Sequence, residues 1–559
     1  MTVTEMKFIG IVSLALAGAG VLRAGVVSPN TNLTAREEQI VAAAKPDASP
    51  RFNGARILGV YPGSPLIDSL AVSGDRPVSF SAKRLPRGLK LDSRSGIISG
   101  SLKTAGEYRF KAIARNSAGV AETEIKIIAG GTLALAPPMG WNSYDSFGDS
   151  VTEAETLANA QWMKEHLQPV GWDIVVVDFR WYDSRADGLR VQNPEGVTID
   201  EFGRCIPPAN RFPSATNGAG FTPLADKLHA MGLKFGIHIM RGIPRKAVDQ
   251  NCPVAGSKFT AAEAVLPEDD INRTCVWNRD MFGVDATTGA GKAWYAAIAG
   301  QYAAWGVDYI KCDDISNLQR GKAYDAEEIE ALSTALKNSG RSIVLSLSPG
   351  ATPLNQGSHV ARFANLWRIS PDFWDDWNSL DRNFNLFASW AAQVKPGRWP
   401  DGDMVPFGHI CARNCDVRPD RWTRFTRDEQ VTLMSLWALA SSPLMLGMNL
   451  PDNDAWTAAI ISSPEVLAVN QDPLGRAAQR RSGLSQMSEI WTKELADGSL
   501  AVGFFNRTDK PVTVDVPWRD LKLPSEPQVR DLWLREDLGR QRSFAADLPP
   551  HGCALLRLH

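Results

Sequence analysis

Between residues 135 and 480 the chain alternates apolar, strand-like runs with helical stretches, and this alternation constrains the fold more than any other feature. Apolar runs occupy residues 173–179, 234–240, 309–314 and 342–348, and longer helical segments separate them. Near-continuous apolar strands separated by helices form a parallel sheet that is covered on both faces. About eight such strand–helix units, in a segment of this length, predict an α/β fold of the (β/α)8 TIM barrel type.

The segments on either side of this region have the texture of antiparallel β-structure. Residues 54–130 contain short alternating runs separated by Gly, Ser and Asn, which is typical of a small Ig-like β-sandwich. The same texture returns over residues 485–559, where we expect a C-terminal antiparallel β-sandwich. Residues 25–53 are polar and rich in Pro, Asn and Ala, so we expect a linker or a short cap there.

The first 24 residues have the pattern of a signal peptide. Lys7 precedes an apolar run from Phe8 to Leu22, and small residues near Ala24 suit a cleavage site. This run is short for a membrane span, although a membrane anchor or a wrongly assigned start is the alternative. We therefore expect export, with the mature protein secreted or periplasmic and not bound to a membrane.

Composition narrows the classes of ligand. The formal net charge is −2, which gives no electrostatic basis for binding nucleic acid or an acidic membrane surface. Neutral substrates are expected instead. Neither Cys411-x3-Cys415 nor the seven scattered histidines has the spacing of a zinc site, so no metal or other cofactor is expected.

The seven cysteines leave at least one without a partner in the chain. Cys411 and Cys415 are close enough in sequence to form a disulfide, and Cys252 could reach Cys275. Spacing alone does not decide between these pairings.

Polar residues occur where the predicted strands end. In a TIM barrel the carboxyl ends of the strands meet at one rim, and active sites are built there. We therefore expect the following side chains to converge: Trp141, Asp178, His238, Lys311, Asp313, Ser348, Arg368, Asp372 and Asp403. Trp181 follows the second strand, and its indole suits the apolar face of a sugar as well as it suits barrel packing.

Two of these carboxylates suit the cleavage of a glycosidic bond. One carboxylate attacks or stabilises the anomeric carbon, while the other donates and then accepts a proton. Lys311 should keep Asp313 ionised, as a nucleophile requires. Asp372 lies among aromatic residues, and partial desolvation there would raise its pKa, as a general acid requires.

At these residues the sequence resembles glycoside hydrolase family 27, the α-galactosidase and α-N-acetylgalactosaminidase family. The matching segments are "PPMGWNSY", "WGVDYIKCDD", "WRISPDFWDDW", "GRWPDGDMV" and "EVLAVNQDPLG". The resemblance covers residues 135–559, and it implies a retaining α-glycosidase that needs no metal. It assigns the nucleophile to Asp313, the acid/base to Asp372, and sugar contacts to Lys311 and Arg368.

Three departures from the family pattern concern the substrate. The second strand of the family usually ends in two adjacent aspartates, but here Phe179 follows Asp178. His238 stands where a tyrosine is usual. Ser348 aligns with a glutamate that often holds O2 in the galactosidases, and a small residue there resembles the N-acetylgalactosaminidase pattern.

The sequence therefore predicts an exported, exo-acting retaining α-glycosidase on an oligosaccharide or polysaccharide, with α-galactosidase ranked first. The alternatives in the same family are α-N-acetylgalactosaminidase and β-L-arabinopyranosidase. A non-catalytic carbohydrate-binding protein is the alternative of another class. Simpler structural roles also remain open: Asp372 could serve only as the ion partner of Arg368, His238 could be a core histidine, and Asp314 is expected to cap the next helix.

Overall fold

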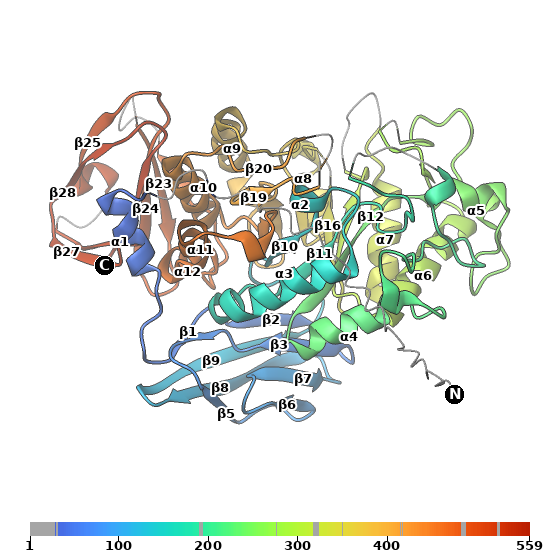
Figure 1. The fold of residues 1–559 in the computed structure, drawn as a ribbon, viewed down its shortest axis with the longest axis horizontal. Helices are drawn as coiled ribbons and strands as arrows, with labels where there is room; N and C mark the ends of the chain where they lie inside the picture. Colours follow the sequence, from blue (N-terminus) through green and yellow to red (C-terminus); the bar gives the residue numbers. More distant parts are fainter. Residues whose placement is uncertain are drawn as a thin grey trace, which may run out of the picture.

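The computed structural model describes residue 28 and residues 32–559, apart from 189–193, 276, 317–322, 349, 414, 416–417, 482–487 and 523–525. At its centre eight parallel strands form one sheet (Figure 1). In sheet order they are β18 (Trp399–Asp401), β17 (Leu366–Arg368), β16 (Val344–Leu347), β15 (Tyr309–Asp313), β12 (Lys234–Met240), β11 (Ile174–Val177), β10 (Met139–Asn142) and β21 (Leu444–Leu446).

The two edges of this sheet meet. Val405, just beyond β18, forms a parallel bridge with Leu446 of β21. Its amide donates to the carbonyl of Met445 at 2.7 Å, and its carbonyl accepts from the amide of Gly447 at 3.1 Å. Closure leaves the ladder without a free edge, and it confirms the predicted (β/α)8 barrel.

Helices separate the strands and cover the outside of the barrel (Figure 1). They include α3 (Glu153–His166), α4 (Thr222–Ala230), α6 (Gly289–Ala304), α7 (Ala326–Asn338), α8 (Gly357–Phe363), α9 (Trp377–Trp390), α10 (Arg427–Ala440), α11 (Ala455–Ser462) and α12 (Pro464–Asn470). Thr152 and Thr426 begin α3 and α10 with capping boxes, in which the side chain and a glutamate three residues later satisfy free amides.

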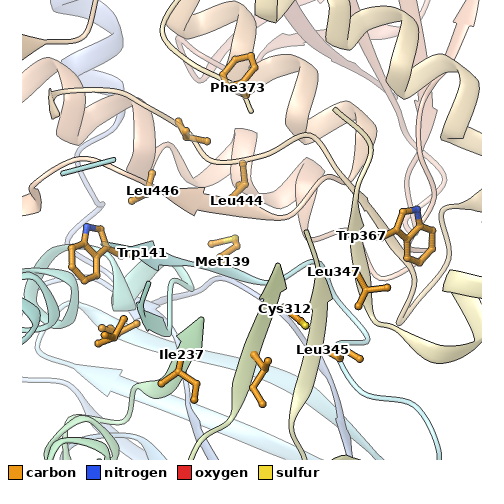
Figure 2. Packing of buried hydrophobic residues seen from close by; sticks show 14 of the residues in the cluster. Met139, Trp141, Ile237, Cys312, Leu345, Leu347, Trp367, Phe373, Leu444 and Leu446 are labelled. Atoms are coloured by element: carbon orange, nitrogen blue, oxygen red, sulfur yellow. The ribbon is translucent and has the colours of Figure 1, made fainter. Parts of the chain in front are cut away.

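Large apolar side chains fill the space between strands and helices. Figure 2 shows Trp141 and Trp367 at two sides of this core. Between them lie Ile237 of β12, Cys312 of β15 and Leu347 of β16. Both indoles are fully buried. Burial on this scale supplies the main driving force for folding and leaves the strand ends rigid enough to position a site.

The N-terminal β-region forms two larger sheets and the two-stranded pair of β1 (Arg51–Phe52) and β4 (Val72–Ser73), with a core of its own, as expected for a sandwich. One sheet contains β2 (Ile57–Val60), β5 (Ser79–Lys83), β8 (Gly106–Asn116) and β9 (Gly119–Ala129), and the other contains β3 (Pro65–Ser69), β6 (Leu89–Leu91) and β7 (Ile97–Ser101). Asp68 pairs with Lys234 at the start of β12, and Ser64 contacts Ser342 just before β16. The sandwich thus lies at the amino ends of the barrel strands.

The C-terminal region is also a sandwich around a separate core. Its six-stranded sheet contains, in order, β22 (Gln479–Arg481), β23 (Ser488–Glu494), β24 (Leu500–Asn506), β29 (Cys553–Leu558), β26 (Gln528–Asp531) and β27 (Glu536–Arg540). The second sheet pairs β25 (Val512–Pro517) with β28 (Ser543–Leu548).

Part of the predicted linker is helical. Helix α1 (Ala35–Ala43) begins with a capping box between Thr34 and Glu37. Figure 1 shows it beside the C-terminal sandwich, and Arg36 donates to the carbonyl of Cys553 at 3.3 Å. The segment therefore reaches from the N-terminal sandwich to the C-terminal one.

In the part of the chain that the structure describes, no helix is both long enough and apolar enough to cross a membrane. The predicted signal peptide, residues 1–24, lies outside that part.

Candidate active site

A pocket opens at the carboxyl ends of the barrel strands. Seven of the residues predicted from sequence line it: Asp178, Lys311, Asp313, Ser348, Arg368, Asp372 and Asp403. They come from the ends of β11, β15, β16, β17 and β18, or from the segments that follow these strands. Strands far apart in the sequence thus deliver charged groups to one place, because parallel strands in a closed barrel all end at the same rim.

Asp313 is a buried carboxylate at the end of β15. Its side chain is 11% exposed, and its Oδ2 lies 3.0 Å from Nε2 of His238. Burial alone would raise the pKa of Asp313, but Lys311 and His238 outweigh it and hold that pKa well below its usual value. The group is therefore ionised when the enzyme is free, which is the state a nucleophile needs.

Lys311 lies on the same strand as Asp313 and contacts Asp178, which directly follows β11. Its Nζ donates to Oδ2 of Asp178 at 3.1 Å, and Asn142 donates to the same oxygen at 2.5 Å. Burial would lower the pKa of Lys311, yet Asp178 and Asp313 raise it well above its usual value. Burial likewise opposes ionisation of Asp178, but Lys311 and His238 leave its pKa lowered.

Arg368 organises the opposite side of the pocket. It lies 2.9 Å from Oδ2 of Asp403 and 3.2 Å from Oδ1 of Asp372. The amide of Phe373 also donates to Asp403, at 2.8 Å. Asp403 has a backbone φ of 86°, an unusual value for a residue other than glycine, and such conformations concentrate at functional sites.

Asp372 stands at the mouth of the pocket. Its side chain is 69% exposed, whereas the neighbouring Phe373 is buried. The aromatic enclosure that the sequence argument required for a raised pKa is therefore absent in this structure. The reason is geometric: Phe373 turns into the core toward Trp437, leaving the carboxyl of Asp372 toward solvent.

Three predicted sugar contacts do not line the pocket. Trp141 is buried and donates from Nε1 to the carbonyl of Met448 at 2.8 Å. Trp181 is buried and donates to the carbonyl of His238 at 2.6 Å. Both indoles therefore belong to the hydrophobic core and not to the lining of the pocket. His238 lies one layer below the pocket, where it contacts Asp313 rather than open space.

Phe179 forms an aromatic wall of the pocket. Its ring packs edge-on against Tyr144 and His238, with ring centroids 6.2 and 5.4 Å apart, and it is tilted against Trp277 at 5.7 Å. Phe179 itself is only 2% exposed.

Sequence reasoning missed several lining residues: Tyr144, Asp145, Trp277, Trp374 and Arg418. Tyr144 and Asp145 directly follow the first strand, so the rule that strand ends build the site could have included them. Trp277 and Arg418 come from long loop segments, and no local pattern marks them. The Arg418 guanidinium stacks on Trp374, 3.9 Å from its ring centroid.

The cysteine pairing and the position of Asp314 were also predicted from the sequence. Cys411 and Cys415 form a disulfide, whereas Cys252 carries a free thiol, so only the first pairing is present. Asp314 does not cap α7, the next helix in the part of the chain that the structure describes, because Asp325 is the N-cap of that helix. Asp314 instead accepts hydrogen bonds from Arg241 and Trp277.

The pocket thus combines one enclosed, ionised carboxylate with one solvent-exposed carboxyl group at its mouth. Glycosidases use such a pair of carboxyl groups to cleave a glycosidic bond. Within the described residues, no group of three or more His, Cys, Asp or Glu side chains is arranged to hold a metal ion.

Comparison with known families supports this assignment. Residues 280–472 match the model described as alpha galactosidase A, and residues 485–558 match the alpha galactosidase C-terminal beta sandwich domain. Residues 56–129 match an Ig domain family. These matches confirm both the resemblance of the barrel and the identity of the N-terminal sandwich.

Individual relatives agree with the family models. A probable alpha-galactosidase of Dictyostelium discoideum is 28% identical over 439 residues, covering 76% of this chain and 93% of that one. Two crystal structures, each covering 76% of this chain, are more similar. One is a GH27 β-L-arabinopyranosidase from Geobacillus stearothermophilus, with 44% identity, 96% coverage of that chain and a TM-score of 0.73. The other is a candidate α-N-acetylgalactosaminidase from Bacillus halodurans, with 41% identity, 97% coverage and a TM-score of 0.67. On this evidence the chain belongs to glycoside hydrolase family 27 and is a glycoside hydrolase.

Proposed function

We propose that this protein is a retaining, exo-acting glycosidase that removes terminal β-L-arabinopyranosyl residues, with α-D-galactosyl residues as the second substrate. The observation that carries the choice is the aromatic wall at Phe179. β-L-Arabinopyranose has the ring stereochemistry of α-D-galactopyranose but lacks the hydroxymethyl group on C5. A pocket that presents Phe179 in place of a second aspartate favours the sugar that needs fewer polar contacts.

Asp313 acts as the nucleophile in the proposed mechanism. Its carboxylate oxygen attacks the anomeric carbon while Asp372 transfers its proton to the glycosidic oxygen. The bond between the anomeric carbon and that oxygen breaks, the aglycone leaves as an alcohol, and a glycosyl ester on Asp313 remains. Lys311 supports this step because it holds Asp313 ionised before attack.

Water completes the turnover. Asp372, now a carboxylate, takes a proton from a water molecule as the water oxygen attacks the anomeric carbon. The ester to Asp313 breaks, the free sugar is released with its original anomeric configuration, and Asp372 is protonated again. The exposed position of Asp372 suits this role, because its carboxyl group must reach both the leaving group and bulk water.

The relatives support more than one sugar. The similarity to the β-L-arabinopyranosidase from Geobacillus stearothermophilus, at 44% identity, favours arabinose, while the curated alpha-galactosidases are 28% identical. This order reverses the expectation from sequence, which placed galactose first. Ser348 lines the pocket and leaves space that an acetamido group could occupy, so N-acetylgalactosamine is included in the test.

The test is kcat/KM on nitrophenyl β-L-arabinopyranoside, α-D-galactopyranoside and α-N-acetylgalactosaminide. We expect the first to exceed the others at least tenfold, about 1.4 kcal/mol of discrimination, which is a common value for one substituent in a pocket. Phe179→Asp should shift the ratio toward galactoside, while Phe179→Leu, which keeps an apolar wall, should not. A wild-type preference for either of the other two sugars would refute arabinose as the main substrate.

We also propose that the protein is exported. The support is the Lys7 and Phe8–Leu22 pattern, together with the Cys411–Cys415 disulfide, since disulfides persist in oxidising compartments. Mass spectrometry of protein from the native source should find a mature N-terminus near residue 25. An intact N-terminus on soluble cytosolic protein would contradict export.

A further inference from the structure

Asp145 lies in the pocket without an assigned role. It belongs to the short helix α2 (Tyr144–Phe147), directly after β10. Its carbonyl accepts a hydrogen bond from the amide of Cys411 at 2.6 Å, and the next side chain, Ser146, donates to the carbonyl of Gly447 at 2.6 Å. The backbone is therefore fixed from two sides, and the Asp145 side chain lines the same pocket as Asp313.

One oxygen of the Asp145 carboxyl group is buried without a hydrogen-bond partner. The residue is 3% exposed, and its Oδ2 is buried without a donor or an acceptor. An unsatisfied buried carboxyl group is costly, so its presence calls for an explanation. Three of the other pocket carboxylates are paired, Asp178 with Lys311 and both Asp372 and Asp403 with Arg368. Asp313 lies 3.0 Å from His238, although its Oδ1 is also buried without a hydrogen-bond partner.

The fold makes room for this carboxyl group. A Cβ atom on Gly447, just beyond β21, would lie 2.1 Å from Oδ2 of Asp145 and 2.6 Å from its Cγ. Gly447 does not have a positive φ, so its backbone conformation is open to other residues. Glycine at position 447 is therefore required by the space that the Asp145 carboxyl group occupies, and not by the backbone conformation.

We propose that Asp145 is a further sugar-binding residue, whose carboxyl group donates a hydrogen bond to a hydroxyl of the monosaccharide in the pocket. The inference rests on the proposed function for the identity of that monosaccharide. It explains why a group that destabilises the free protein is retained: its partner arrives with the substrate. Stability is commonly sacrificed in this way at binding sites.

Electrostatics supports a donor rather than an acceptor. Burial raises the pKa of Asp145 well above its usual value, and the carboxylates of Asp403, Asp178 and Asp375 raise it further, against the opposing effect of Lys311. A neutral carboxyl group carries an O–H donor as well as a carbonyl acceptor. Sugar hydroxyls accept from such a group without adding a further negative charge to the pocket.

The experiment compares the binding of free monosaccharides to four variants by calorimetry. The ligands are L-arabinose, D-galactose and N-acetyl-D-galactosamine, and the variants are Asp145→Asn, Asp145→Ala, Gly447→Ala and the control Asp149→Ala. Asp149 is another buried carboxylate, but it pairs with Arg180 and does not line the pocket. Melting temperature is measured for every variant.

For Asp145→Ala we expect Kd for the preferred sugar to rise at least tenfold, a typical loss for one buried hydrogen bond, with an unchanged or higher melting temperature. Asp145→Asn keeps an N–H donor and should stay within about threefold of wild type. Its affinity should also persist at alkaline pH, where wild-type affinity falls as Asp145 ionises. Gly447→Ala should weaken binding by displacing the carboxyl group, while Asp149→Ala should lower only the melting temperature.

Several results would overturn the proposal. Wild-type affinity in Asp145→Ala would show that the carboxyl group does not touch the sugar. Equal losses in the Ala and Asn variants would exclude a donor role. A lower melting temperature of Asp145→Ala with unchanged Kd would make the residue structural. If wild type binds none of the three sugars, the proposed function itself is wrong and this inference falls with it.

Discussion

At the scale of single residues, the site depends on how each carboxyl group is paired. Asp313 is enclosed yet ionised, because the Lys311 and His238 charges outweigh its burial. Asp372 shares Arg368 with Asp403 but remains open to solvent. Two chemically identical side chains thus have different surroundings, one enclosed beside a lysine and one open to solvent.

The first prediction concerns Asp313. Asp313→Asn should lower kcat by at least about a thousandfold, because the amide cannot form the glycosyl ester. A mechanism-based inhibitor followed by peptide mass spectrometry should label Asp313 in the wild type. As a control, Asp314→Asn keeps only one of the two acceptor oxygens that bond Arg241 and Trp277, so it should lower the melting temperature with the label still on Asp313. Label on Asp314 would disprove the assignment.

The second prediction concerns Asp372. Asp372→Ala should reduce kcat/KM for alkyl glycosides at least about a hundredfold more than for dinitrophenyl glycosides, because only poor leaving groups need protonation. Added azide should restore part of the activity and yield a glycosyl azide of retained configuration. Equal losses on both types of leaving group would remove Asp372 from the acid/base role. Asp376→Ala is the matched control, since that side chain caps α9.

The third prediction concerns pH. The pKa of Asp313 is held below its usual value, so ionised nucleophile is present above that pKa and is lost only as pH falls through it. Lys311→Met removes the larger of the two lowering charges, so the pKa of Asp313 should rise. The acidic limb of kcat/KM should then move to higher pH by about one unit or more, apart from any overall loss of activity. An acidic limb at unchanged pH would show that Lys311 does not control ionisation of Asp313.

At the scale of secondary-structure elements, one lysine joins the C-terminal sandwich to the barrel. Lys493 of β23 is buried, and its Nζ donates to the carbonyls of Ala438 and Val469 and to the hydroxyl of Ser441. These acceptors lie at the ends of α10 and α12, where carbonyls lack helical partners and a cation is favourable. Burial lowers the pKa of Lys493 to about 7. The three acceptors nevertheless match the three N–H groups of an ammonium ion, so we regard the charged form as the native one.

The fourth prediction follows from these contacts. Lys493→Met should lower the free energy of unfolding by about 2–4 kcal/mol, because it removes the Nζ donor from buried acceptors at two helix ends. Lys510→Met, at an exposed site in the same sandwich, should change it by less than about 0.5 kcal/mol. Urea unfolding followed by tryptophan fluorescence provides both values. Equal stability of the two variants would show that the helix ends find other donors.

At the scale of the whole molecule, the Ig-like sandwich and the pocket lie at opposite ends of the barrel. Asp68 of the sandwich pairs with Lys234 at 3.2 Å, and Lys234 also pairs with Asp173 of the barrel. Lys234 begins β12, whereas Asp313 ends the neighbouring β15. In a TIM barrel, residues at the amino ends of the strands serve stability, while the chemistry takes place at the carboxyl ends.

The fifth prediction tests this separation. Asp68→Ala should lower the free energy of unfolding by about 1–3 kcal/mol, because it removes one of the two carboxylate partners of the partly buried Lys234. It should leave kcat/KM unchanged, since the contact lies far from the strand ends that form the pocket. Glu124→Ala, which breaks an exposed ion pair with Arg109, is the control and should cost less than about 1 kcal/mol. A loss of activity in Asp68→Ala without loss of stability would mean that the sandwich acts on the site.

Much of the fold was predictable because its signals are periodic and local. The apolar run 309–314 reads as a buried strand from its residue types alone, and it is β15. The same rule for strand ends placed Asp178, Lys311, Asp313, Arg368 and Asp403 at one rim, where they line the pocket. It failed for Trp141 and Trp181, because residue type does not tell whether an indole at a strand end turns toward the rim or into the core.

The sequence by itself determined the order of elements and the chemistry of the strand ends, since hydrophobic period and charge are properties of neighbouring residues. Only the tertiary structure decided which groups meet. Nothing in the sequence places Gly447 against Asp145, stacks Arg418 on Trp374, or leaves Asp372 in solvent while Phe373 turns inward. These relations depend on barrel closure and on loop paths that no local pattern encodes.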